Sequence, residues 1–160
     1  MKTNFKQIFL AAAAALFLLV SCKKEHTGQD GSGNSYTYAN GGNPKTEKIA
    51  RATWIPEGKE MRLLLYNSGN ANDGVELYLE TAGPNFSAIP EGTFTNAPDN
   101  VAFRSAILYY NDGDESYTVS NIGRKITIAK DGNNYKINFE FTSSMGLVQG
   151  SYNGPVERAQ

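Results

Sequence analysis

Few side chains in this sequence are of a type that performs covalent or metal chemistry. The chain of 160 residues has one cysteine, Cys22, and one histidine, His26, and both stand near its N-terminus. A His-dependent nucleophilic triad or a His and Cys zinc site therefore cannot be assembled downstream of residue 26. Phosphate-loop and dinucleotide fingerprints are missing as well. We expect no catalytic residue, no metal site and no cofactor in the folded part of the chain.

Paired carboxylates are the remaining candidates for acid–base chemistry. Glu76 and Glu80 fall on one face of an expected strand, which puts their α-carbons roughly 13 Å apart. Glycosidases need two carboxyl groups at about 5–10 Å across a cleft. A solvated face with Lys and Arg nearby is the better interpretation of these residues. The sequence therefore predicts a protein that is not an enzyme.

An acidic turn gathers three carboxylates at Asp112-Gly113-Asp114-Glu115. Oxygen-rich loops bind Ca²⁺, but this spacing lacks the alternate acids, the sixth-position Gly and the twelfth-position Glu of the EF-hand loop. We interpret the segment as the acidic tip of a hairpin.

Tyrosines are the more informative group for binding. The adjacent residues Tyr109 and Tyr110 must point to opposite faces of a strand, so at least one of them is expected to face outward. Exposed tyrosines bind sugar rings and protein partners, because they offer rigid contact area with a polar tip. Tyr109 and Tyr110 are therefore the predicted ligand-binding residues.

Side-chain periodicity from Tyr36 onward is two rather than 3.6, which indicates strands. In residues 135–141 apolar side chains alternate with Lys, Asn and Glu, and Asp131-Gly132-Asn133-Asn134 supplies a tight hairpin turn before them. Residues 101–110 are apolar on both faces, as in a central strand. Small neighbours at Ala50 and Ala52 predict that Trp54 is a core anchor. Further strands are expected over residues 61–66, 75–80, 117–119, 125–130 and 147–152.

Glycine and asparagine interrupt these runs every 8–12 residues, the spacing of an all-β sandwich or barrel. No stretch downstream of the N-terminal segment sustains a helical apolar stripe. The sequence predicts a single all-β domain over residues 36–160, an antiparallel β-sandwich or flattened β-barrel of about 8–10 strands. Sandwich and barrel are both compatible with the pattern.

We expect the first 35 residues to be a secretion signal and a tether. The unbroken apolar run over residues 8–20 is too short for a bilayer span of about 20 residues and fits a signal peptide. Leu19-Val20-Ser21-Cys22 resembles the bacterial lipoprotein signal. The resemblance implies a signal peptide over residues 1–21 and lipidation of Cys22. Residues 22–35 hold no large apolar side chain and are expected to form a flexible, lipidated tether that anchors the protein to a membrane.

The net charge of the processed chain indicates which partners to expect, and the residue after Cys22 indicates which membrane holds the protein. Loss of residues 1–21 removes Lys2 and Lys6 and no acid, which leaves 13 basic and 16 acidic residues, a net charge of −3. This balance argues against a nucleic-acid partner, since such proteins carry a clustered basic surplus. Lys23 stands where Asp commonly marks inner-membrane retention, so the resemblance implies the outer membrane. Lys23-Lys24-Glu25 is loosely similar to the export tags of Bacteroidetes surface lipoproteins, and the sequence leaves both membrane faces open.

Two segments of the expected domain carry a resemblance. Ile89-Pro90-Glu91-Gly92-Thr93-Phe94-Thr95 is similar to an "lPaGtYt" turn and strand, and Gly150-Ser151-Tyr152-Asn153-Gly154-Pro155 is similar to a closing "I.GsYsGpl" signature. Both motifs belong to a family of small Bacteroides-type outer-membrane lipoproteins, which this chain resembles. The resemblance implies a lipocalin-like or β-sandwich domain. It implies no active site.

The sequence favours a non-catalytic, lipid-anchored envelope module that binds a glycan or another envelope protein. One alternative is a lipocalin-like carrier, in which a hollow barrel holds a small apolar ligand. The inward residues of the expected strands are large and would fill a small barrel, which favours a packed core over a hollow interior. A further alternative is a subunit of a surface assembly that pairs through exposed strand edges.

Overall fold

The structure is a computed structural model, which describes residues 33–40, 42–97, 99–117 and 123–159. These residues belong to one compact unit. The expected signal peptide, Cys22, His26 and the tether up to residue 32 lie outside the described residues, as do Thr118 and Val119. Across the described ranges, no helix is long and apolar enough to cross a membrane.

Eleven strands make up the described part of the chain, which confirms the all-β fold. Their bounds are β1 Ser35–Asn40, β2 Asn43–Glu57, β3 Glu60–Asn67, β4 Gly74–Thr81, β5 Gly92–Thr95, β6 Val101–Tyr110, β7 Asp114–Tyr117, β8 Lys125–Asp131, β9 Asn134–Ser143, β10 Gly146–Gly154 and β11 Val156–Arg158. The count is one more than the upper end of the expected 8–10, and β11 is a short segment for which no strand was expected.

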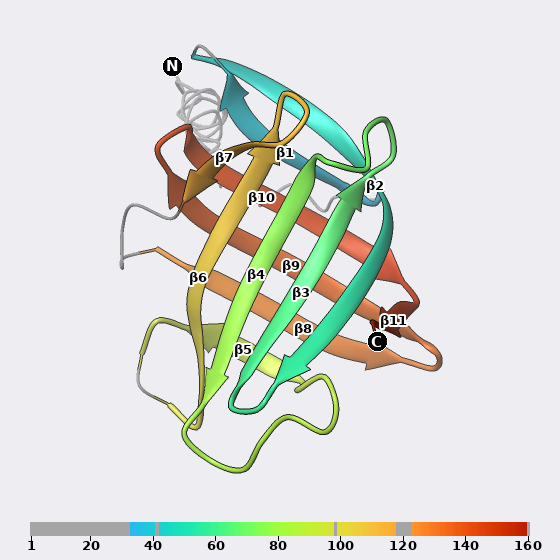
Figure 1. The fold of residues 1–160 in the computed structure, drawn as a ribbon, viewed down its shortest axis with the longest axis vertical. Helices are drawn as coiled ribbons and strands as arrows, with labels where there is room; N and C mark the ends of the chain where they lie inside the picture. The colour runs from blue at the N-terminus through green and yellow to red at the C-terminus, as the bar shows by residue number, and fades with distance from the viewer. Residues whose placement is uncertain (1–32, 41, 98, 118–122, 160) are drawn as a thin grey trace, which may run out of the picture. The chain divides into compact units, whose positions relative to one another are not determined.

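The strands form one sheet in the order β5-β8-β9-β10-β1-β2-β3-β4-β6-β7. Figure 1 shows this sheet curled on itself, with β3, β4 and β6 crossing over β8, β9 and β10. The result is a half-barrel, in which one face of the sheet lines the interior. The expectation that every pair is antiparallel is wrong for β11. Pro155 lacks the backbone donor needed to continue the β10 ladder, and the last strand then runs parallel to β2.

The long strand β2 joins the two layers. Its first part pairs with β1, and its second part pairs with β3. The register shifts between Ile49 and Arg51, where an extra residue exchanges the two faces of the strand. As a result Ile49 and Ala52 both face the core, whereas Ala50 is exposed. Ala50 therefore does not share the face of Trp54, contrary to the sequence prediction, although Trp54 is buried as expected.

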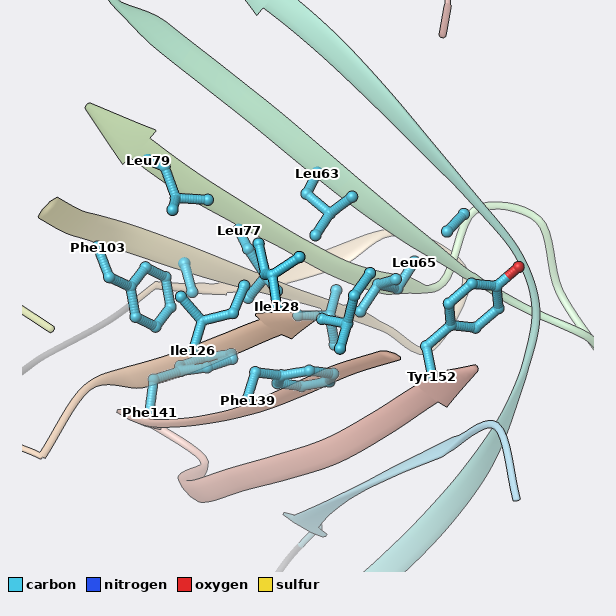
Figure 2. Packing of buried hydrophobic residues seen from close by; sticks show 14 of the residues in the cluster. Leu63, Leu65, Leu77, Leu79, Phe103, Ile126, Ile128, Phe139, Phe141 and Tyr152 are labelled. Atoms are coloured by element: carbon cyan, nitrogen blue, oxygen red, sulfur yellow. The ribbon is translucent and has the colours of Figure 1, made fainter. Parts of the chain in front are cut away.

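The core lies between the two layers, and large side chains fill it. Figure 2 shows leucines of β3 and β4 directed toward isoleucines and phenylalanines of β8 and β9. Among the described residues, the side chains with no measurable exposure are Met61, Leu63, Leu77, Leu79, Phe103, Ala106, Leu108, Ile126, Ile137, Phe141 and Val148. They belong to one continuous apolar cluster that draws on both layers. Burial of this continuous apolar face is the main force that holds the curl closed.

Two predicted hairpin connections have the expected turn chemistry. Gly132 has a φ of 62° between β8 and β9, a left-handed conformation that favours glycine. Asn111 and Asp112 have φ values of 50° and 68° between β6 and β7. Asn and Asp are the non-glycine residues that best tolerate this region.

Hydrogen bonds hold Asn34, the residue directly before β1. The carbonyl oxygen of Asn34 accepts a hydrogen bond from the backbone N–H of Ile49 at 2.8 Å. The Asn34 side chain accepts another from the N–H of Asn153 at 2.7 Å. Strand β1 starts at Ser35, next to the expected domain boundary at residue 36, and pairs with both β10 and β2.

Gly150 is a glycine at which an added methyl group would meet atoms of three other residues. A Cβ built there lies 2.5 Å from a ring carbon of Phe139, 2.7 Å from the Ser35 carbonyl oxygen and 2.8 Å from the Tyr36 Cβ. We expect Gly150→Ala to lower the free energy of unfolding by about 1–3 kcal/mol, since overpacking forces backbone shifts. Urea denaturation measures this change. Gly33→Ala is the control, because nothing lies within 4 Å of its added Cβ; equal midpoints for the two variants would contradict the prediction.

Candidate functional site

The predicted ligand-binding residues Tyr109 and Tyr110 point to opposite sides of β6. Tyr110 packs against the core, and its ring centroid lies 6.1 Å from that of Tyr38. Tyr109 lies on the outer face of the sheet, where its hydroxyl group donates a hydrogen bond to Glu76 on β4 at 2.9 Å. Only Tyr109 is therefore in a position to take part in an outward-facing site.

Glu76 is the centre of a polar network on this outer face. Its side chain is only 5% exposed, because the side chains around it cover it. One carboxylate oxygen accepts from the Arg62 guanidinium at 3.2 Å, and the other accepts from Tyr109. Arg62 also forms an ion pair with Glu57. Both oxygens of a buried charge thus have partners, as its burial requires.

The register of β3, β4 and β6 places a glycine between two tyrosines beside this network. Gly74 pairs with Tyr66 on one side and with Tyr109 on the other. Residues paired in this way share a face. A Cβ built at Gly74 would lie 2.3 Å from the carbonyl oxygen of Leu65, so the close approach of β3 favours glycine here. A hollow of about 300 Å³ lies here, bounded by both tyrosines, the Arg62–Glu76 pair and the loop residues Ala71, Asn72 and Asp73.

Tyr66 forms the other aromatic border of the hollow and is held from both sides. The hydroxyl group of Thr53 donates to the Tyr66 hydroxyl at 3.3 Å. The Arg51 guanidinium lies over the Tyr66 ring, 4.3 Å from its centroid. This cation–π contact and the hydrogen bond fix the ring orientation.

Burial and the Glu76 charge change the acidity of two tyrosines in the network. Burial, followed by the negative charge of Glu76, raises the pKa of Tyr78 to about 12. Burial, followed by the hydrogen bond to Glu76, raises the pKa of Tyr109 as well. Both phenols are therefore neutral hydrogen-bond donors over the physiological range.

The loop beside the hollow is tied to the β6–β7 turn. Asn70 and Asn72 donate to one Asp112 carboxylate oxygen, at 3.1 Å and 2.7 Å. In return, the backbone N–H groups of Asp112 and Gly113 donate to Asp73 at 2.8 Å and 3.1 Å. Hydrogen bonding from Asn72, and then from Asn70, lowers the pKa of Asp112.

These contacts bear on the acidic turn that the sequence singled out. Asp112 uses its carboxylate to accept amide donors rather than to face its acidic neighbours. Within the described ranges, no group of three or more His, Cys, Asp or Glu side chains is placed to hold a metal ion.

The carboxylates weighed for acid–base chemistry are both in ion pairs. Glu76 binds Arg62, and Glu80, four residues further along β4, binds Arg104. Each carboxylate thus has a cationic partner of its own.

Gly74 and Arg62 border the hollow, although no local sequence pattern singles them out as members of a site. Their role depends on the pairing of β3 with β4 and of β4 with β6, and a single strand carries no signal for that register. The alternation of polar residues with core leucines in β3 and β4 was the available signal that their outer faces would meet.

No family model matches the chain, and no curated protein or solved structure matches it.

Tyr78→Phe tests the network through its pH dependence. Because the folded-state pKa of Tyr78 is raised from 10.0 to about 12, its contribution to stability is present below pH 10 and is lost as the pH rises toward 12. We expect the urea midpoint of the unmodified protein to fall across this window and that of Tyr78→Phe to fall less steeply. The urea midpoint of each protein is divided by its value at neutral pH and plotted against pH. Curves of equal slope for the two proteins would contradict the buried environment assigned to Tyr78.

Proposed function

We propose that this protein is a non-catalytic, lipid-anchored envelope protein that binds a glycan in the hollow beside Tyr109. The observation that carries the proposal is the position of the Tyr109 ring. It borders the hollow beside Gly74, and buried Glu76 holds its hydroxyl group. Of the two tyrosines predicted to bind a ligand, Tyr109 alone belongs to the proposed site, because Tyr110 packs on the core side of β6.

The chemistry of the hollow suits a sugar ring. Tyrosine rings offer flat apolar area for the C–H face of a pyranose and a polar tip for its hydroxyl groups. The carboxylate of Asp73 and the amide of Asn72 supply acceptors and donors at the loop side. A volume of about 300 Å³ is at the lower end of small-molecule sites. A concave site of this size favours a sugar unit over the flat surface of a protein partner.

Preorganisation supports binding at this place. The hydroxyl group of Tyr109 is bound to Glu76, and the ring of Tyr66 is held by Thr53 and Arg51. Side chains that are already fixed lose little conformational entropy when a ligand binds. The loop that closes one end of the hollow is likewise tied to the β6–β7 turn through Asp73 and Asp112.

The carrier alternative needs a hollow interior, and the observed packing does not favour it. Side chains from both layers form one continuous cluster, with phenylalanines and leucines at its centre (Figure 2). A barrel filled in this way has little room for an apolar ligand.

The anchor is part of the same proposal and rests on the sequence. The apolar run before Cys22, and the resemblance of residues 19–22 to a lipoprotein signal, support lipidation of the only thiol. Lys23 supports the outer membrane as its location. Acyl chains would hold the protein at the membrane, since each buried methylene contributes about 0.8 kcal/mol.

Tyr109→Ala tests the binding site. We expect it to weaken binding to the recognised polysaccharide by roughly thirtyfold, because a central aromatic contact contributes about 2 kcal/mol. Affinity electrophoresis against neutral and acidic polysaccharides would show the loss. Leu147→Ala, at an exposed position on β10, is the control and should leave binding unchanged.

The melting temperature distinguishes lost contact from lost fold. Tyr109→Phe retains the ring and should keep most of the affinity. Binding that survives in Tyr109→Ala, or no binding by the unmodified protein to any polysaccharide of the panel, would contradict the proposed function.

Cys22→Ser tests the anchor separately from the site. We expect the variant expressed in a diderm bacterium to leave the membrane fraction, and its intact mass to lack the acyl chains found on the unmodified protein. Detergent partitioning and mass spectrometry provide the two measurements. Equal membrane association of both proteins, with no acyl mass on either, would contradict lipidation.

A further inference from the structure

A second hollow, of about 360 Å³, lies where β4 and β6 meet the start of β8. Glu80 on β4, Ala102 and Arg104 on β6, Asn96 before β6 and Arg124 before β8 line it, together with Phe103. Its residues are distinct from those around Tyr109, so it is a separate feature of the surface (Figure 1 shows the three strands).

Two arginines come together here although they are 20 residues apart in the chain. The register of β6 against β4 shifts between Tyr78 and Leu79, which pair with Ser105 and Phe103, so Arg104 is the extra residue of a bulge. Arg104 remains 61% exposed at this bulge. Arg124 has only 8% of its surface exposed, and its Nη1 donates a hydrogen bond to the carbonyl oxygen of Arg104.

The two cations are close enough to affect each other. Burial, followed by the positive charge of Arg104, lowers the pKa of Arg124. Like charges held near a partly buried surface repel, and an anion between them would relieve that repulsion.

The charges of the lining are unbalanced. Glu80 is the only acidic residue in the described lining, and it forms an ion pair with Arg104. Two positive charges therefore face one negative charge around the hollow, and the Asn96 amide adds a neutral donor. A concave lining with a cationic surplus attracts anions more strongly than a flat surface does.

We infer that this hollow binds an oxyanion, the carboxylate or sulfate group of an acidic ligand, between Arg104 and Arg124. Guanidinium groups present several N–H donors in a plane, which matches the oxygens of carboxylate and sulfate. Arg104 would supply the accessible charge, and Arg124 a charge fixed by the fold. The inference does not depend on the glycan site, and either can fail alone.

The test is a titration of the full-length protein with inorganic sulfate and, separately, with glucuronate. NMR amide shifts of Asn96, Ala102 and Arg104 report binding, while sodium chloride keeps the ionic strength constant. We expect saturable shifts at these residues with one ligand or both; the ligand that saturates identifies the group recognised. Failure of both to bind would overturn the inference.

Three variants make the test specific. Arg104→Gln should weaken binding roughly tenfold, because it removes a charge-assisted hydrogen bond. Glu80→Gln should tighten binding about threefold, because it removes the one negative charge and releases Arg104. Lys48→Gln removes an exposed positive charge on β2 and should change nothing.

Equal weakening in Arg104→Gln and Lys48→Gln would indicate general attraction by surface charge and would overturn the inference. Weaker binding in Glu80→Gln would do the same. The dispersion of each spectrum establishes that the variant is folded, so a loss of binding is not a loss of structure.

Discussion

The extra residue that β2 inserts between Ile49 and Arg51 is the constraint on which the described structure depends. A strand of fifteen residues with an unbroken period of two would keep the same side chains on one face throughout. The bulge exchanges the faces, so Ile49 in the first part and Ala52 in the second both reach the core. One strand thereby serves two layers, and the sheet folds over onto itself. The outer face of β3, β4 and β6 is then free to carry polar and aromatic groups.

Strand β4 organises both surface features that follow from this arrangement. Its outer face carries Glu76 and Glu80, and each holds an arginine from a neighbouring strand. Neighbouring side chains cover Glu76, and its two carboxylate oxygens accept hydrogen bonds, one from Arg62 and one from Tyr109. The second of these bonds fixes the Tyr109 ring at the edge of a hollow. Glu80 is more open and neutralises only part of the charge around it. A glutamate on β4 thus fixes the Tyr109 ring at one hollow, whereas a second glutamate offsets only one of the two arginine charges at the other hollow.

Local sequence pattern predicted the elements, whereas the sites depend on long-range pairing. Alternation in residues 135–141 and the glycine turn at 132 identified β9 and its hairpin because both signals are local. The same approach assigned Ala50 to the face of Trp54, since a bulge leaves the composition of a strand unchanged. It placed Tyr109 on a strand but could not name Glu76 as its partner, 33 residues away. Arg104 is the extra residue of a second bulge, and Arg124, 20 residues away, donates to its carbonyl oxygen, a contact that no local pattern predicts.

The position of β1 inside the sheet has a mechanical consequence. Strand β1 is an interior strand, bound to β10 on one side and to β2 on the other, and Asn34 is hydrogen-bonded just before it. Removal of β1 from the sheet therefore requires two ladders to break, one on each side of the strand. An edge strand at this position would be held by one ladder alone.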